Sequence, residues 1–227
     1  MALTLVEKVH LTDNVWSFRF KSDKPLHWTP GQFIYVELPH DNPDGEGTKR
    51  WFTVSSAPYE GVIQITTRVT GTTFKTALSK LPVGGPLTLV DAPDGDFVWE
   101  DKDLPLVFVA GGIGITPFHS ILAQRAHDHE PLNVTLIYTG RTPDVPFKDE
   151  IALWQKQDAG LKVDYVTGGR LTTEKLKQLV PDLDKSLVYI SGPEPMVESL
   201  GDELRASGLT DDHLKQDFFP NYDDHNF

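Results

Sequence analysis

The chain has 227 residues and no cysteine, and its 33 acidic against 21 basic side chains give a formal net charge of −12. The absence of cysteine excludes disulfides, thiolate-bound zinc, a cysteine nucleophile and an iron–sulfur cluster held by this chain. The negative charge argues against nucleic acid or an anionic membrane as the main partner. No apolar run approaches the ~20 residues of a membrane-spanning helix. The start of the chain does not resemble a signal peptide, so we expect a cytoplasmic protein.

Residues 1–101 are predicted to form an antiparallel β-barrel. Segments that alternate between polar and apolar residues are separated by short turns. This period of two is typical of half-buried strands, which we expect at 15–20, 31–38, 51–54 and 62–68. The polar stretch 39–49 is expected to be a surface loop. Strand following strand with short gaps favours a barrel or sandwich.

Residues 102–227 are predicted to form an α/β domain with a parallel sheet. Wholly apolar runs, typical of buried parallel strands, alternate with stretches that have apolar residues at helical spacing. The expected strands are 106–110, 134–138, 161–166 and 187–191. The last expected helix carries Met196, Leu200 and Leu204, with Gly208 placed to end it. An acidic tail with several aromatic residues closes the chain.

A glycine-rich segment, GGIGITP at residues 111–117, follows the first of these strands and opens a helix. Glycines let a diphosphate approach backbone N–H groups at the start of a helix. Thr116 suits the N-cap position and Pro117 the first helical position. The spacing differs from G-x-G-x-x-G, and a purely structural tight turn is the alternative interpretation.

A second motif lies at residues 50–53, RWFT, in the predicted barrel. Arg50 can grip a phosphate with its fork of donors. Phe52 faces the same side of the strand and offers an apolar wall. Thr53 offers a hydroxyl to a ring nitrogen. Alone, the motif also fits a barrel strand with a surface arginine.

Together with two later segments, these motifs resemble the ferredoxin–NADP reductase superfamily of flavin oxidoreductases. The family pattern is R-x-[YF]-[ST], then G-G-x-G-x-T-P, then a C-G-P turn and an aromatic C-terminal strand. Residues 50–53 and 111–117 match the first two, and 191–193 match the third with Ser in place of Cys. The segment 216–222, QDFFPNY, resembles the fourth but has Pro-Asn before the tyrosine. The resemblance covers nearly the entire chain, with its motifs in order.

The resemblance implies that the first domain binds FAD. Arg50 would hold a flavin phosphate, and Thr53 would hydrogen-bond flavin N5, the atom that accepts hydride. The turn at 71–74 would hold the flavin diphosphate on backbone amides, with Thr73 as the helix cap, which favours FAD over FMN. The strand end at 67–69 would contact flavin largely through its backbone. The implied flavin-binding residues are Arg50, Trp51, Phe52, Thr53, Thr67, Arg68, Val69, Gly71, Thr72, Thr73 and Phe74.

The resemblance also implies that the second domain binds a nicotinamide nucleotide. Ser191 would lie beside nicotinamide C4 and, with Thr53, is one of the two expected catalytic residues. Arg141 and Arg170 follow the second and third strands of this domain and favour a ribose 2′-phosphate, hence NADPH, with NADH as the alternative. The aromatic tail has two interpretations: Tyr222 or Phe227 covers the flavin face, or Phe218 and Phe219 belong to the core and the acidic tail is solvated. The implied residues are Gly111, Gly112, Gly114, Thr116, Pro117, Arg141, Arg170, Ser191, Gly192, Pro193, Phe219 and Tyr222.

No metal site is expected from the histidines. Eight are present, but they show no metal-ligand spacing. His127 and His129 are two apart on an expected helix and so do not face each other. No G-x-S-x-G segment is present, so a hydrolase triad has no support.

We therefore expect an FAD-dependent NAD(P)H oxidoreductase that passes hydride from nicotinamide to flavin N5, and electrons on to an external acceptor. Ferredoxin or flavodoxin is one class of acceptor, although docking an acidic carrier on this acidic chain needs basic residues to cluster, for example near positions 49, 50, 68 and 75. A first alternative is an NAD(P)H:flavin or ferric reductase with diffusible acceptors. A second is a non-catalytic or complex-dependent electron-transfer module on the same fold.

Overall fold

The computed structural model describes residues 1–219, which form two compact units. The first unit comprises Met1–Trp99 and His119–Gln124, and the second comprises Glu100–Phe118 and the chain from Arg125 onward. Of the expected site residues, Tyr222 lies outside the described part of the chain.

The first unit is an antiparallel sheet of six strands in the order β4-β3-β6-β1-β2-β5. A bridge between Val54, just after β4, and Ile65 in β5 joins the two ends of this order, so the sheet closes into a barrel. The prediction of an antiparallel β-barrel is confirmed. The strands are β1 (Ala2–Thr12), β2 (Val15–Ser22), β3 (Phe33–Glu37), β4 (Lys49–Thr53), β5 (Ile63–Arg68) and β6 (Pro86–Leu89).

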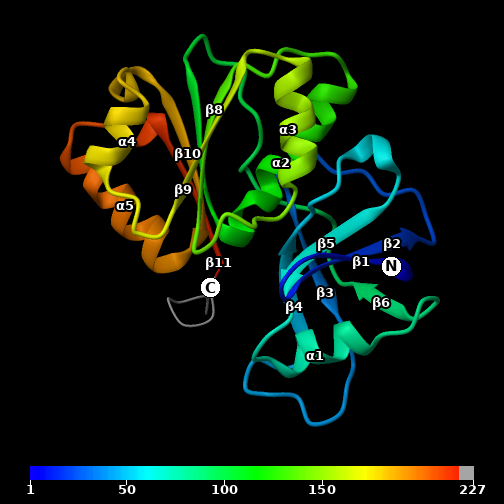
Figure 1. Cartoon of the computed structure of the whole chain (residues 1–227). Helices are drawn as coiled ribbons and strands as arrows, with labels where there is room; N and C mark the ends of the chain where they lie inside the picture. Colours follow the sequence, from blue (N-terminus) through cyan, green and yellow to red (C-terminus); the bar gives the residue numbers. More distant parts are fainter. Residues whose placement is uncertain (220–227) are drawn as a thin grey trace. The chain divides into compact units, whose positions relative to one another are not determined.

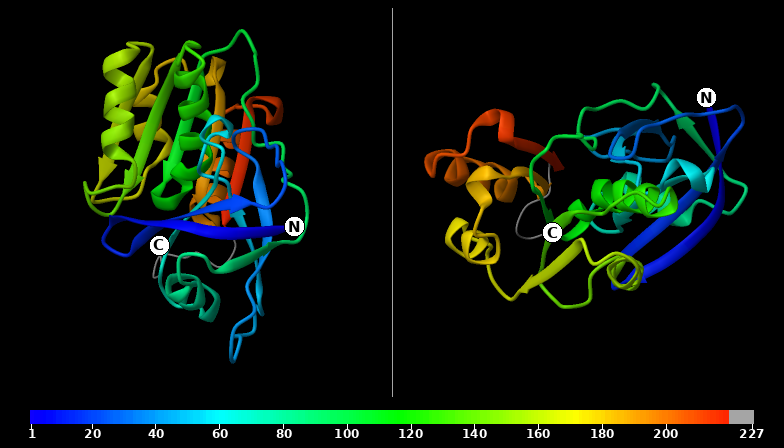
Figure 2. Two further views of the ribbon diagram at one scale, coloured as in Figure 1. Left: turned by 90° about the vertical axis from the view of Figure 1, so that its right-hand side faces the viewer. Right: turned by 90° about the horizontal axis from the view of Figure 1, so that it is seen from above.

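The barrel core follows from the alternation of its strands. In β3 every second side chain is buried, and the inward residues of β1 and β2, which run side by side in Figure 2, join the same cluster. Helix α1 (Thr73–Lys80) closes the cluster with Phe74 and Leu78, which are fully buried. A single turn, η1 (Pro58–Glu60), lies between β4 and β5. Because Phe74 and Leu78 are buried in the barrel core, the start of α1 is fixed against the barrel.

The second unit contains a parallel sheet of five strands in the order β11-β10-β7-β8-β9, which confirms the predicted α/β class. Because all five strands run the same way, their carboxyl ends lie at one edge of the sheet. The strands are β7 (Leu106–Gly111), β8 (Val134–Gly140), β9 (Leu161–Thr167), β10 (Leu187–Pro193) and β11 (Leu214–Phe219).

Helices cover both faces of this sheet (Figure 1). On one face, α4 and α5 pack against Val109 of β7 and Ile190 of β10 through buried leucines. On the other face, Phe108 stacks on Phe118 of α2 with ring centroids 4.5 Å apart. The helices are α2 (Ile115–His127), α3 (Lys148–Gln157), α4 (Thr173–Leu179) and α5 (Glu194–Ala206), with short turns η2 (Gly112–Gly114), η3 (Leu183–Lys185) and η4 (Asp211–His213).

Candidate functional site

In the first unit, Arg50 projects from β4 into a cluster made by its own hairpin loop. Its side chain is 12% exposed. Nη2 lies 3.1 Å from Asp44 Oδ1, and Nη1 donates to the carbonyls of Glu46, Gly47 and Lys49. Nε is buried and lies 2.9 Å from Glu46 Oε2, yet within the described residues it makes no hydrogen bond. The guanidinium is therefore held in place, with its nitrogens facing the carboxylates of Asp44 and Glu46 and three backbone carbonyls of the hairpin.

The start of α1 meets the same carboxylate. Thr73 N donates to Asp44 Oδ2 at 2.9 Å, and Asp44 N donates to the Thr73 hydroxyl at 3.0 Å. The Thr73 amide, helped by the Thr73 hydroxyl, the Glu46 amide and Arg50, lowers the pKa of Asp44 from 3.8 to about 2. Asp44 is therefore ionised at neutral pH and occupies the positive end of the helix.

The cap of α1 is Thr72 and not Thr73, which corrects the sequence expectation. The Thr72 side chain accepts from Lys75 N, and Thr72 has the extended backbone of an N-cap. Thr73 is the first helical residue, and its hydroxyl contacts His40 Nε2 at 2.9 Å. The preceding Gly71 has a φ of +77°, so the chain reverses there in a conformation that other residues avoid.

An aromatic floor lies beneath Arg50. Its guanidinium is 5.3 Å from the centroid of the Phe74 ring, and the Phe52 ring is 5.8 Å from the same centroid. Trp51 points to the opposite face of the strand, where it stacks on Tyr35 at 4.1 Å and remains 54% exposed. The structure thus brings Arg50, Phe52 and the start of α1 together and leaves Trp51 apart from them.

The other expected flavin residues lie along the barrel wall. Thr53 and Thr67 are buried at the ends of β4 and β5. Arg68 donates to the Asn14 side chain, and Val69 N donates to the Asn14 carbonyl at 2.8 Å. These two residues therefore help hold the end of β5 to the β1–β2 turn, and their contact with a flavin stays a prediction.

In the second unit, the glycine turn is packed against backbone. A Cβ on Gly114 would overlap the Ser191 carbonyl oxygen, and one on Gly111 would come within 2.6 Å of Met196 Sδ. Gly112 has a φ of +49°. Side chains are therefore excluded from this turn by strand β10 at Gly114 and by Met196 of α5 at Gly111.

Thr116 is not an N-cap, which corrects the second capping prediction. The turn η2 (Gly112–Gly114) runs directly into α2, so Thr116 and Pro117 both lie inside the first helical turn. The Thr116 hydroxyl donates to the Ile113 carbonyl at 3.1 Å, and the side chain is buried. The first helical turn is still a suitable place for a proline, because its missing N–H has no intrahelical partner there.

Ser191 lies at the carboxyl end of β10, in register with Ala110 of β7 and Asp217 of β11. It is fully buried, and its hydroxyl donates to Asp217 Oδ2 at 3.2 Å. Phe219 follows on β11, in register with Pro193. Sequence reasoning missed Asp217, although it stands within the aromatic motif of the last strand.

The two arginines follow neighbouring parallel strands. Arg141 is exposed after β8, and Arg170 follows β9. Arg170 Nη2 lies 2.7 Å from Glu203 Oε1 and also contacts the Ser199 hydroxyl. A hydrogen bond from the Thr173 hydroxyl, reinforced by its amide and by Arg170, lowers the pKa of Glu203. Glu203 thus stays charged, and Arg170 would have to leave this ion pair in order to bind a phosphate.

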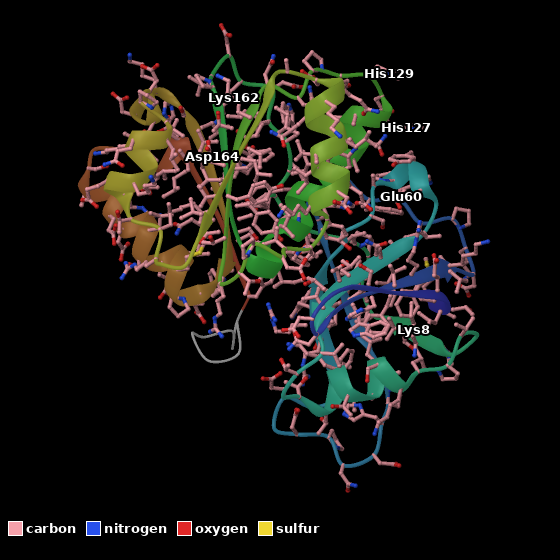
Figure 3. The ribbon with its side chains drawn as sticks, viewed as in Figure 1. Lys8, Glu60, His127, His129, Lys162 and Asp164 are labelled. Atoms are coloured by element: carbon pink, nitrogen blue, oxygen red, sulfur yellow. The ribbon has the colours of Figure 1, made fainter. Side chains whose placement is uncertain are left out.

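The side chains and helices of residues 1–219 also bear on metal binding and on membrane insertion. No group of three or more His, Asp or Glu side chains in this range is arranged to hold a metal ion. His127 ends α2, and His129 beyond it has a φ of 57° (Figure 3). None of the helices described in this range is long and apolar enough to cross a membrane.

Comparisons with known proteins agree with this architecture. The model of the oxidoreductase NAD-binding domain family matches residues 108–202. The NADH oxidoreductase HCR of Escherichia coli K12 is 31% identical over 92% of this chain, which spans 65% of that protein. The glycine betaine monooxygenase reductase subunit of Chromohalobacter salexigens is 27% identical over 94% of this chain and 62% of its own length.

Among solved structures, the flavohem-like FAD/NAD binding domain of nitric oxide dioxygenase from Vibrio cholerae superposes with a TM-score of 0.81. That structure is 22% identical, with 96% of this chain and 98% of that domain covered. The chain spans only 58% to 65% of the curated relatives named above and of a flavohemoprotein from Oceanobacillus iheyensis. In its ordered motifs, its two units and these comparisons, the chain is similar to proteins of the ferredoxin–NADP reductase-like superfamily, and it has their fold.

Proposed function

We propose that the chain is an FAD-dependent NAD(P)H oxidoreductase that delivers electrons to an acceptor outside the chain. One observation carries the flavin half of this proposal: Arg50 and the start of α1 already hold an anion, the carboxylate of Asp44, over an aromatic floor. A guanidinium and a helix N-terminus that converge on one anion are suited to phosphate.

On the flavin side, Arg50 and the amides at the start of α1 bind the phosphates. The buried Arg50 Nε faces Glu46 Oε2 without a hydrogen bond, and a phosphate oxygen that replaced this carboxylate would satisfy the donor. Phe52 and Phe74 supply apolar contact, and the Thr53 hydroxyl orients flavin N5. Together with a nicotinamide, a bound flavin supplies hydride transfer from C4 to N5, and the chain supplies binding and orientation.

On the nicotinamide side, the 111–117 turn binds the dinucleotide diphosphate at the start of α2. Ser191 positions the nicotinamide ring, and Asp217 fixes the Ser191 hydroxyl through their hydrogen bond. Arg141 and Arg170 favour NADPH through its 2′-phosphate, although Glu203 competes for Arg170. The E. coli relative is named an NADH oxidoreductase, so NADH remains the alternative.

The electron acceptor is external because this chain has no cysteine to hold a cluster. One relative is the reductase subunit of a monooxygenase, and others are flavohemoproteins longer than this chain. We therefore propose a redox group outside this chain, on a partner domain or protein, as the acceptor, ferredoxin or flavodoxin being one class.

A second candidate function is an NAD(P)H:flavin reductase that binds flavin as a dissociable substrate. The observation that favours it is the occupation of the phosphate donors by Asp44, which opposes tight flavin binding.

Steady-state oxidation of NADPH and NADH separates these functions. The purified chain is assayed with FAD bound at stoichiometry, then with excess free FAD or FMN, each with and without an artificial electron acceptor. The oxidoreductase requires the acceptor and saturates at one flavin per chain. The flavin reductase shows a rate that rises with free flavin well beyond that ratio. A chain that binds flavin and oxidises neither nucleotide would refute both functions and support the non-catalytic module.

A further inference from the structure

The loop between β3 and β4, residues 38–48 and hereafter the β3–β4 loop, carries an acidic residue onto the start of α1. Figure 1 and the left view of Figure 2 show this loop, drawn in blue, near α1. The two segments are far apart in sequence, yet they are tied by a pair of hydrogen bonds between Asp44 and Thr73 at 2.9 and 3.0 Å. Such a reciprocal pair fixes one position of the loop.

The carboxylate of Asp44 collects the same donors that would bind a phosphate. Oδ1 accepts from Arg50 Nη2 and from Glu46 N, both at 3.1 Å, and Oδ2 accepts from Thr73 N at 2.9 Å. These donors are a guanidinium, a loop amide and a helix N-terminal amide. Two anions cannot share them, because carboxylate and phosphate would repel each other at this separation.

We propose that Asp44 is an affinity-determining residue, an internal competitor that occupies the flavin phosphate position and makes flavin an exchangeable ligand. This inference rests on the proposed flavin-binding function. It adds that displacement of Asp44 controls the affinity for flavin. Flavin binds when Asp44 leaves Arg50 and Thr73, and the β3–β4 loop opens with it. The movement is confined to the β3–β4 loop, because the paired strands β3 and β4 hold the loop at both ends.

Two features of the loop support its release. Gly45 and Gly47 follow Asp44 on either side of Glu46, and neither has an atom within 4 Å of the place where a Cβ would stand, so the backbone there is unobstructed. In the closed loop Arg50 Nε is buried and lies 2.9 Å from Glu46 Oε2, in an ion pair without a hydrogen bond. A phosphate that accepted from Nε as well as from the amides of Thr73 and Glu46 would gain a hydrogen bond that the Asp44 carboxylate does not make.

The test is a titration of the full chain with three flavins, followed by quenching of flavin fluorescence. FAD and FMN carry phosphate, and riboflavin does not. The variant Asp44→Asn keeps the shape of the side chain and removes its charge. Asp41→Asn is the matched control, because Asp41 lies in the same loop, is exposed and makes the same change in net charge.

We expect Asp44→Asn to bind FAD and FMN about tenfold more tightly than the unmodified chain, since one charge-assisted competitor is removed. Riboflavin affinity stays unchanged, and Asp41→Asn binds all three flavins as the unmodified chain does. The inference is overturned if FAD binds Asp44→Asn no more tightly, or if riboflavin gains as much as FAD.

A second arm separates this inference from the proposed function. Inorganic pyrophosphate is titrated while the amide resonance of Thr73 is followed by NMR. If no variant binds any flavin, the proposed function fails, and the pyrophosphate arm then decides the role of Asp44. Tighter pyrophosphate binding by Asp44→Asn supports the internal competitor, and equal or weaker binding refutes it.

Discussion

In the first unit the candidate anion site combines the Arg50 side chain with backbone amides and is occupied by the Asp44 side chain, whereas in the second unit the corresponding turn is built from backbone. Arg50 and Asp44 reach the start of α1 from β4 and from the β3–β4 loop. The 111–117 turn instead packs glycine backbone against Ser191 and Met196. A side-chain site can be tuned by substitution without loss of the fold. A backbone site cannot be tuned in this way, because a side chain at its glycines would overlap neighbouring atoms of the fold.

The largest expected effect lies in the second unit. Gly114→Val places a side chain on the Ser191 carbonyl, and we expect it to destabilise the protein by more than about 3 kcal/mol. Urea unfolding monitored by circular dichroism measures this loss. Gly169→Val is the control in the same unit, because nothing lies within 4 Å of a Cβ at that position. Near-equal stability of the two variants would show that the glycine turn of the second unit is not required for its packing.

The next effect lies in the first unit. Arg50→Gln removes the charged fork at the start of α1, and we expect FAD to bind about 10- to 100-fold more weakly while the fold is retained. Fluorescence titration measures the affinity, and the melting temperature checks the fold. Arg19→Gln, which removes a guanidinium paired with Glu60 instead, serves as the control and should keep its flavin affinity. Unchanged FAD affinity in Arg50→Gln would show that the phosphate binds elsewhere.

A smaller effect is expected at Ser191. Ser191→Ala removes the hydroxyl that Asp217 holds, and we expect the rate of flavin reduction by NAD(P)H to fall about tenfold. Stopped-flow absorbance measures the rate. Ser191→Cys, which restores the residue usual in the family, should recover most of it. Equal rates in the alanine variant and the unmodified chain would remove Ser191 from the proposed chemistry.

Nucleotide preference should change by only a few-fold. Arg141→Ala and Arg170→Ala each remove an exposed cation, so we expect kcat/KM to fall for NADPH and to stay constant for NADH. Glu203→Gln releases Arg170 from its ion pair and should move the preference the other way. If the double arginine variant keeps its NADPH:NADH ratio, the 2′-phosphate assignment is wrong.

The smallest effect is a difference in stability that depends on pH. The pKa of Asp44 is lowered to about 2 in the fold from 3.8, so its contacts stabilise the fold above the unfolded value. This contribution is lost as pH falls through the range between those values. At pH 5 to 7 we expect the flavin-free chain to have a higher melting temperature than Asp44→Asn. The two melting temperatures should converge as the pH falls toward about 2. A constant difference across this range would contradict the Asp44 contacts.

Local patterns in the sequence predicted the barrel, the parallel sheet and the placing of Arg50 and Ser191, because alternation and motif spacing act over a few residues. The cap of α1 was misplaced by one residue, since Thr72 and Thr73 are equally good candidates until the helix boundary is known. Thr116 was misplaced because η2 adds a turn before α2. Asp44 was missed because its partner Thr73 is 29 residues away, and no local pattern predicts such a contact.

The visible spectrum of the chain with one equivalent of FAD, recorded anaerobically before and after NADPH and then NADH, shows whether the chain transfers hydride to a bound flavin. We expect a two-band flavin spectrum that bleaches, faster with the preferred nucleotide, and a loss of bound flavin in Arg50→Gln. A chain that binds neither FAD nor FMN, or whose bound flavin is reduced by neither nucleotide, is not a flavin-dependent NAD(P)H oxidoreductase.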